Sequence, residues 1–286
     1  MRAWSRHRAA STAWLSVSYI ILFTALIVAA FPFLWMFLSS FKTNPQIYRI
    51  PITLLPPSPT VENYTMLLTG QHIPFLRQFF NSSVIAAIRI TVNLLACSAA
   101  AYAFAKYTFP LQNVLFMLII GFLMIPPQIT VVPLFLLMNS FGWLDTIQAV
   151  ALPGAFTAFG VFLLRQVMVS SVPLEIIESA RMDGASEFRT FVQLVLRLPA
   201  VSSGMIVLAT LTFVATWNEY FWPVIALRSS SKFTLPVGLA SLVGMYRVEY
   251  GMLMAGGFMA VFPVMLFFIF GRKTFMQGFT AGAVKG

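Results

Sequence analysis

Charged side chains are scarce in this chain, and acidic ones are scarcer than basic ones. Its 286 residues include 8 Asp and Glu against 18 Lys and Arg; only 9% are charged and 59% are hydrophobic. An average soluble domain carries about a quarter charged residues. The composition therefore indicates an integral membrane protein. The net charge of +10 does not indicate nucleic-acid binding, because the basic residues are dispersed between apolar runs.

Cysteine and histidine are also nearly absent. The single cysteine, Cys97, excludes an intrachain disulfide, and His7 and His72 are too few for a His/Cys metal cluster. The sequence has no Gly-rich loop followed by Lys-Ser or Lys-Thr, so it has no motif for binding a nucleotide. We expect no enzyme activity, no metal site and no cofactor in this chain. Powered transport would then depend on a partner protein or on an ion gradient.

Long apolar runs are what the sequence does contain. Six are long enough to cross a hydrocarbon core, which needs about 20 apolar residues. They lie at residues 13–38, 81–104, 111–132, 146–169, 200–222 and 252–270. Pro126 and Pro127 break the third run, which predicts a separate helix over 131–138 at the outer surface. The first run follows a basic segment, as in a secretory signal, but it is too long and further spans follow it, so we expect it to be retained.

The basic residues favour a topology with both termini in the cytoplasm. The residues placed inside are Arg2, Arg6, Arg8, Lys106, Arg165, Arg181, Arg189, Arg197, Arg272, Lys273 and Lys285. External connections then fall at 41–78, 139–145 and 225–251. We predict an all-α polytopic fold with six transmembrane helices in a single domain, residues 1–286. It would have a cytoplasmic loop at about 170–199 and a cytoplasmic tail at 271–286.

The loop from Pro173 to Pro199 gathers several charges between two predicted spans. Pro173 suits the start of a helix, where backbone N–H groups are unpaired, and Gly184 suits the positive φ at which helices often end. A second, amphipathic helix is predicted after the corner. Its apolar stripe would consist of Phe188, Phe191, Val192 and Val195. From pattern alone, the hairpin either docks in a socket of a partner or lies on the bilayer.

Part of this loop resembles a known motif. Glu178-Ser179-Ala180 followed by Asp183-Gly184-Ala185 looks like the EAA loop of binding-protein-dependent ABC importer permeases. Other segments, in order along nearly the whole chain, are similar to the carbohydrate-uptake subgroup of that family. They are Phe33-Leu34-Trp35, Ser39-Ser40-Phe41-Lys42, Glu62-Asn63-Tyr64, Ala101-Tyr102-Ala103-Phe104-Ala105, Met124-Ile125-Pro126-Pro127, Trp217-Asn218-Glu219 and the ending Gln277 to Gly286, which resembles that of the maltose-type G subunit.

Two departures from the family pattern lie in the loop. Ser179 replaces the usual middle Ala, a small change that still permits close packing. The family pattern places Pro where Arg197 stands, and here Leu198-Pro199 follows two residues later. We expect the extra length to be accommodated at the start of the fifth span, and we carry over no contact beyond about Leu194.

The resemblance implies a type I permease subunit of an ATP-driven importer in the bacterial or archaeal cytoplasmic membrane. Its partners would be a second, homologous permease in a heterodimer, two ATPase subunits that bind ATP and Mg, and an extracytoplasmic solute-binding protein that delivers a carbohydrate. A glycerophosphodiester or a polyol stays open as the solute. The alternatives from other classes are a gradient-driven secondary transporter and a membrane scaffold without transport.

The resemblance also implies residue roles. The ATPase-coupling residues would be Glu178, Ser179, Ala180, Asp183, Gly184, Ala185 and Phe188. Glu178 would form an ion pair with the ATPase, Ala180 would allow close approach, and Asp183 with Gly184 would make the corner. The tail, with Gln277, Gly278 and Lys285, would reach the ATPase dimer on an extended backbone that its glycines permit; a frayed terminus is the alternative.

Polar residues in or near spans usually face the bundle interior or an aqueous cavity. On this basis Arg89, Asn93 and Glu219 are candidates for the translocation path, with Trp217 and Asn218 beside them. Trp217 and Trp222 either stack on a sugar or anchor span ends at the interface. The charged residues of the last external segment either contact the binding protein or are ordinary solvated side chains. These are Arg228, Lys232, Arg247 and Glu249.

Overall fold

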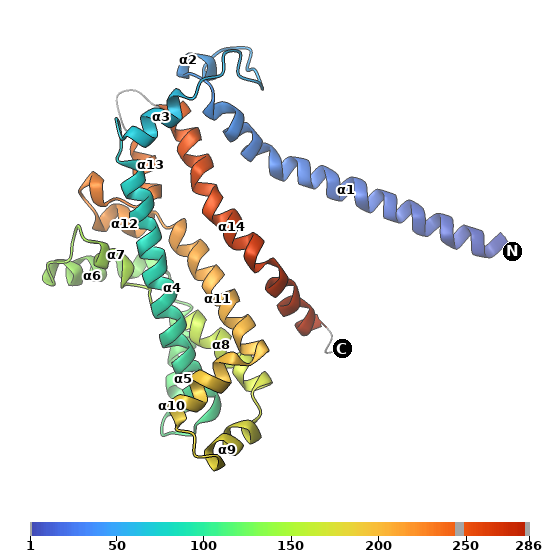
Figure 1. Ribbon diagram of the computed structural model, residues 1–286, viewed down its shortest axis with the longest axis vertical. Helices are drawn as coiled ribbons and strands as arrows, with labels where there is room; N and C mark the ends of the chain where they lie inside the picture. Colours follow the sequence, from blue (N-terminus) through green and yellow to red (C-terminus); the bar gives the residue numbers. More distant parts are fainter. Residues whose placement is uncertain (1, 244–248, 284–286) are drawn as a thin grey trace. The chain divides into compact units, whose positions relative to one another are not determined.

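The structure is a computed structural model that describes residues 2–243 and 249–283. All regular structure within these ranges is helical, which confirms the predicted all-α class. The chain has two compact units, Met1–His72 with Leu242–Met259 and Ile73–Ser241 with Ala260–Gly286. Helix α14 (Tyr250–Ala283) begins in the first unit and continues into the second (Figure 1). Each unit is described by itself, and a single domain over the whole chain stays a prediction.

The first unit consists of α1 (Arg2–Ser40), α2 (Asn44–Ile47), α3 (Glu62–Thr69) and the start of α14. The most apolar 18-residue window of α1 within Val17–Ser40 has a mean hydropathy of 2.5 and contains no buried residue, so its side chains are available to lipid. Asn63 stabilises the turn after α1. Its side-chain amide nitrogen donates to the carbonyl oxygens of Ser40 at 2.7 Å and Lys42 at 2.9 Å. Buried polar contacts therefore fix the end of this helix.

The second unit holds the remaining helices. They are α4 (Phe75–Lys106), α5 (Gln112–Phe122), α6 (Pro127–Ser140), α7 (Ile147–Ala151), α8 (Ala158–Ser171), α9 (Leu174–Met182), α10 (Glu187–Arg189), η1 (Thr190–Leu194), η2 (Val195–Arg197), α11 (Pro199–Trp217), α12 (Phe221–Ala226), η3 (Ser230–Lys232), α13 (Leu235–Ser241) and the rest of α14. Figure 1 shows α4 and α11 side by side in this unit, with α9 and α10 near the carboxyl end of α4.

Helices α4, α8 and α11 form the core of this unit around a buried apolar cluster that includes Cys97, Val161 and Leu208. Gly160 of α8 packs directly against α4. A Cβ atom there would lie 2.8 Å from both Asn93 Oδ1 and Cys97 Sγ. Only glycine therefore fits at this contact without displacing its neighbours.

Within the described residues, four helices are long and apolar enough to cross a membrane, and up to six spans result if each bent helix pair counts as one. The four are the Val17–Ser40 part of α1, α4, α11 and the Tyr250–Ile269 part of α14. The pair α5 and α6 is bent by 99° and the pair α8 and α9 by 78°. The predicted break at Pro126 and the separate helix after it are confirmed, because α6 begins at Pro127.

The predicted boundaries of two other spans are wrong. Residues 146–169 form two helices, α7 and α8, because Pro153 lacks a donor for the helix ladder and Gly154 has φ +75°. Thr157 then starts α8 by accepting the Gly160 amide at 3.1 Å. The fifth span ends at Trp217, five residues earlier than the predicted 222. The irregular segment between α7 and α8 is central to the site described next.

Candidate functional site

The corner of the loop has the predicted geometry. Helix α9 ends at Met182, and Gly184 has φ +76°. The Gly184 amide donates to the carbonyl of Arg181 and the Ala185 amide to that of Ala180, both at 3.0 Å. These two bonds make a Schellman motif, in which a positive φ after the helix satisfies its last carbonyl groups. The Asp183-Gly184 corner is therefore confirmed as a helix stop.

Helix α9 has one buried and one exposed face. Ile177 is buried in the core cluster, and Ala180 is only 8% exposed. Glu178, Ser179 and Asp183 are exposed. Since Ala180 is covered by this chain, its small side chain already serves packing within the unit. Glu178 has no side-chain partner within the part of the chain that the structure describes, so its ion pair with an ATPase stays a prediction.

The second helix of the loop differs from the prediction. Ser186 caps a short α10, and a π-helical turn (η1) and a 3-10 turn (η2) follow. Because π turns use i to i+5 bonds, the expected apolar stripe is not kept on one face. Phe188 is 77% exposed, whereas Val195 is fully buried and Phe191 stacks on Tyr102. The prediction of a single amphipathic α-helix over this stretch was therefore wrong.

The displaced Leu198-Pro199 directly follows these turns. Helix α11 begins at Pro199, which occupies the first helical position where its missing N–H is harmless. The irregular turns span residues 190–197, directly before it. The prediction that the start of the fifth span accommodates the extra length stays a prediction.

Three polar side chains join the loop to the end of α4. Arg181 Nε donates to Glu187 Oε1 at 2.6 Å, and the Tyr107 hydroxyl donates to the same carboxylate. The hydrogen bond from Arg181, helped by that from Tyr107, lowers the pKa of Glu187. Burial and the bond to Glu187 raise the pKa of Tyr107. Sequence reasoning missed this cluster because Tyr107 and Glu187 are 80 positions apart and belong to no local pattern.

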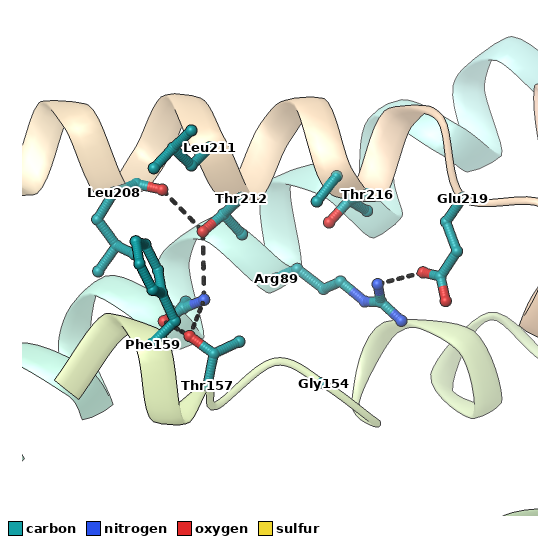
Figure 2. Close-up of a pocket in the computed structure, with 11 residues that line it drawn as sticks. Arg89, Gly154, Thr157, Phe159, Leu208, Leu211, Thr212, Thr216 and Glu219 are labelled. Carbon is teal, nitrogen blue, oxygen red and sulfur yellow. Dashed lines mark hydrogen bonds and ion pairs between the residues drawn. The ribbon is translucent and has the colours of Figure 1, made fainter. Parts of the chain in front are cut away.

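The second unit contains a cavity of about 540 Å³. Figure 2 shows the residues that line it. Arg89, in the middle of α4, forms an ion pair across it with Glu219, which follows α11. Arg89 also donates to the carbonyl oxygens of Val150 at 2.7 Å and Pro153 at 2.9 Å. The irregular backbone between α7 and α8 therefore supplies acceptors to the guanidinium group of Arg89, a residue that is only 8% exposed.

Asn93 lies one helical turn further along α4 and joins three elements. Its amide nitrogen donates to the hydroxyls of Thr157 at 3.3 Å and Thr212 at 3.2 Å. The cavity thus brings together three of the predicted path residues, Arg89, Asn93 and Glu219. The threonines of its wall were missed, because threonine in an apolar run carries no sequence signal of its own.

The other predicted path residues lie elsewhere. Trp217 is buried, and its Nε1 donates to the Ala260 carbonyl at 3.0 Å. Trp222 is also buried and donates to the Ala149 carbonyl at 2.8 Å. Asn218 donates to the Val214 carbonyl. None of the three lines the cavity, and both tryptophans are core residues in this structure.

Two of the four charged residues predicted to meet the binding protein surround Asp145. The Asp145 carboxylate accepts from the Arg228 amide at 2.9 Å and lies 3.4 Å from Lys232 Nζ. Glu249 belongs to the first unit and accepts from the Asn44 amide. Arg247 lies outside the described residues. The Arg228 side chain is exposed and its backbone is fixed.

The tail is helical as far as the structure describes it. Helix α14 runs through Gln277 and Gly278 to Ala283, so the expected extended backbone is wrong for these residues. Glycine costs only about 1 kcal/mol per position in a helix interior, and no proline follows Pro263 to end the helix. Lys285 lies outside the described residues.

Comparison with known proteins identifies the family of this chain. Residues 92–273, more than half of the chain, match the family described as binding-protein-dependent transport system inner membrane component. The chain belongs to this family. The resemblance drawn from the EAA-like loop is thereby confirmed, and the matched range contains the loop and every residue that lines the cavity except Arg89.

Relatives within this transport family align over nearly their whole length. The arabinooligosaccharides transport system permease protein AraQ of Halalkalibacterium halodurans is 36% identical over 91% of this chain and 92% of its own. The lactose transport system permease protein LacG of Rhizobium radiobacter is 32% identical over 94% and 96%. The sn-glycerol-3-phosphate transport system permease protein UgpE of Brucella abortus is 28% identical over 92% and 94%. These relatives are transport permeases and not enzymes.

A solved structure shares the fold of this inner-membrane component. A chain of a bacterial ABC transporter involved in the import of the acidic polysaccharide alginate superposes with a TM-score of 0.80 at 21% identity. The match covers 92% of this chain and 97% of that one. The predicted ABC importer permease fold is therefore confirmed.

Proposed function

We propose that this family member is one of two homologous permease subunits of an ATP-driven importer for a carbohydrate. The observation that carries the proposal is the full-length similarity to permeases whose names specify arabinooligosaccharides and lactose. An extracytoplasmic solute-binding protein delivers the solute, and the two permeases form the path through the membrane. ATP and Mg bind to two separate ATPase subunits, consistent with the lack of a nucleotide-binding motif here.

The loop at 170–199 is the proposed contact with the ATPase. Its corner at Gly184 is rigidly bonded, and two large apolar side chains beside it are exposed, Met182 at 88% and Phe188 at 77%. Exposed apolar groups at a polar surface are typical of protein interfaces. Glu178 supplies a free carboxylate for a basic group of the ATPase. The tail from 271 makes a second contact with the ATPase dimer, in the proposal through Gln277, Gly278 and Lys285.

In this proposal, movement of the loop reaches the membrane helices through the contacts of Glu187 with Arg181 and Tyr107. The Glu187 carboxylate is bonded to both, and Tyr107 directly follows α4. The proposed topology places this loop and both termini in the cytoplasm and the segment around Arg228 and Lys232 outside, facing the binding protein. Movement of the ATPase is then transmitted from the loop to the core helices α4, α8 and α11.

Uptake in cells tests this proposal. The gene is deleted in its own host, and uptake of radiolabelled sugars is measured with and without the restored gene. ATP is depleted with arsenate in one arm, and the proton gradient is collapsed with a protonophore in another. Uptake that depends on the gene, stops on ATP depletion and outlasts brief protonophore treatment supports the proposal. Uptake that follows the proton gradient at constant ATP indicates a secondary transporter and refutes it.

A further inference from the structure

The cavity of Figure 2 contains hydrogen-bonding groups that the chain itself leaves unused. One oxygen of Glu219 is bonded to Arg89, and the other has no partner among the residues that the structure describes. The Thr216 hydroxyl also has no partner within the same ranges, and Thr216 lines the cavity. Both groups lie within four residues of each other at the carboxyl end of α11. They are therefore available to a bound molecule.

The cavity carries no net charge. Of the residues that line it, only Arg89 and Glu219 ionise, and they pair with each other. An anion would have to compete with Glu219 for Arg89 and would be repelled by that carboxylate at short range. A cation would have to compete with Arg89 for Glu219 and would be repelled by the guanidinium group. This electrostatic arrangement favours a neutral solute.

The walls of the cavity differ in polarity. One part is polar and comes from Asn93, Thr157 and Thr212, which bond to one another. Another part is apolar and comes from Phe159, Leu208, Leu211 and Ala215. Phe159 is half-exposed, so its ring is available for contact. A sugar ring has hydroxyls at its edge and C–H groups on its faces, which suits such a pair of walls, and about 540 Å³ lies in the usual range for small-molecule sites.

We propose that this cavity is a subsite for one unit of a neutral, hydroxyl-rich solute. Glu219 accepts a hydrogen bond from a solute hydroxyl through its unbonded oxygen, and Thr216 bonds to a second hydroxyl. Arg89 is a positioning residue that holds Glu219 and balances its charge. The inference rests on the proposed function, because it takes the cavity to lie on the transport path, and it adds that the path selects against anionic solutes.

Two substitutions separate the parts of this proposal. Glu219→Gln keeps the shape of the side chain but removes its charge, which leaves Arg89 without a counter-ion. Affinity for a neutral sugar is expected to fall at least tenfold, and affinity for an anionic solute to rise. Thr216→Val is nearly isosteric and removes one hydroxyl, for which a loss of about three- to tenfold is expected.

Thr210→Val is the matched control. Thr210 is a buried threonine on the same helix whose hydroxyl bonds to the Ile206 carbonyl at 2.9 Å, and it does not line the cavity. This variant should bind as the wild type does. If Glu219→Gln does not fold, as judged by its elution and melting in detergent, Thr216→Val against Thr210→Val decides the question.

The full transporter assembly in lipid nanodiscs provides the assay, with the binding protein and ATP omitted. Equilibrium binding is measured with radiolabelled arabinotriose, lactose and sn-glycerol 3-phosphate. The proposal predicts that a neutral probe binds more tightly than glycerol 3-phosphate, and that Glu219→Gln and Thr216→Val weaken its binding while Thr210→Val does not. It is overturned if neither neutral probe binds, if glycerol 3-phosphate binds more tightly, if both cavity variants bind normally, or if the control loses affinity equally.

Failure of this inference is distinguishable from failure of the proposed function. If uptake in cells is ATP-driven while both cavity variants keep normal affinity, only the subsite is refuted. If uptake follows an ion gradient, the proposed function is refuted whatever the affinities.

Discussion

Two glycines in the second unit are required for opposite reasons. Gly184 has open space around its α-carbon but adopts φ +76°, a conformation that side chains with a Cβ rarely adopt. Gly160 does not have a positive φ, but a Cβ there would meet Asn93, Cys97 and Thr157 at 2.8–2.9 Å. Backbone conformation therefore fixes the first glycine, and lack of space fixes the second.

Gly184→Val should uncouple ATP hydrolysis from uptake. A β-branched residue at positive φ is strained by about 1–2 kcal/mol, which favours a different path for the corner and misplaces the loop. We expect the sugar taken up per ATP hydrolysed to fall severalfold in proteoliposomes, with normal membrane insertion. Gly184→Asn is the control, since asparagine tolerates this conformation. Equal coupling in the valine and asparagine variants would refute this role for the corner.

Gly160→Ala should destabilise the contact of α4 with α8. The added methyl group overpacks a full site, which typically costs about 1–3 kcal/mol. The control is Gly121→Ala in α5, where no atom lies within 4 Å of the added Cβ and the helix should be unchanged or slightly stabilised. Melting of the purified protein in detergent is the measurement. A Gly160→Ala melting temperature equal to that of the control would contradict the packing described here.

At the scale of elements, one acid organises the segment that joins α12 to α13. Asp145 accepts from the amides of Arg228 and Ser229, both at 2.9 Å, and from the Ser229 hydroxyl at 2.5 Å. Burial alone would raise the pKa of Asp145, but these hydrogen bonds, with Lys232 nearby, outweigh it and lower the pKa. The segment is thus tied by its backbone and by Lys232, while the Arg228 side chain is exposed and can contact a partner.

Asp145→Ala should release this segment. We expect the amides of Arg228 and Ser229 to exchange hydrogen at least tenfold faster, measured by mass spectrometry of the peptide that contains them. The exchange rate in Asp145→Asn should lie between those of the wild type and the alanine variant, because asparagine keeps one acceptor oxygen and tolerates the φ of +60° at this position. Unchanged exchange in the alanine variant would show that other contacts hold the segment.

The pH dependence follows from the lowered pKa of Asp145. A carboxyl group whose pKa is lower in the folded state stabilises that state fully above its unfolded value, 3.8 here, and loses this contribution only as pH falls through the lower folded value. Protection of the Arg228 amide, corrected for the intrinsic exchange rate, should therefore be constant between pH 5 and 8. A decline within that range would contradict the assigned cause.

Local patterns predicted the helical elements well, and long-range contacts decided what they missed. The breaks at Pro126 and Gly184 follow from the residues themselves and were predicted. The break at Pro153 was missed because the surrounding residues are apolar and read as one continuous span. The Pro153 carbonyl that this break exposes is an acceptor for Arg89. The pairing of Arg89 with Glu219 joins residues 130 positions apart. Such a pair leaves no periodic signal, so only the fold could reveal it.

At the scale of the whole molecule, the distribution of charge predicts the orientation of the chain. Cys97 is buried, so added cysteines can be labelled against a low background. Ser58 and Ser179 are exposed and lie in segments predicted to be outside and inside, respectively. A membrane-impermeant thiol reagent should label Ser58→Cys in intact spheroplasts and Ser179→Cys only after permeabilisation, in cells without the partner ATPase. The reverse labelling would invert the proposed topology.

We propose that this chain carries solute through the membrane while a separate ATPase supplies the energy. The scarcity of acids supports this proposal, and the cavity acid Glu219 is held in an ion pair with Arg89. The exposed corner of the loop, with Met182 and Phe188 beside it, is the proposed surface through which the ATPase acts.

The most direct test is uptake into proteoliposomes that contain the purified assembly, with the loaded binding protein on one side and ATP on the other. We predict uptake only with ATP and the binding protein together, and none when the ATPase carries a substitution that blocks hydrolysis or when it is omitted. Solute accumulation by this chain without the ATPase, driven by an imposed ion gradient, would contradict the account.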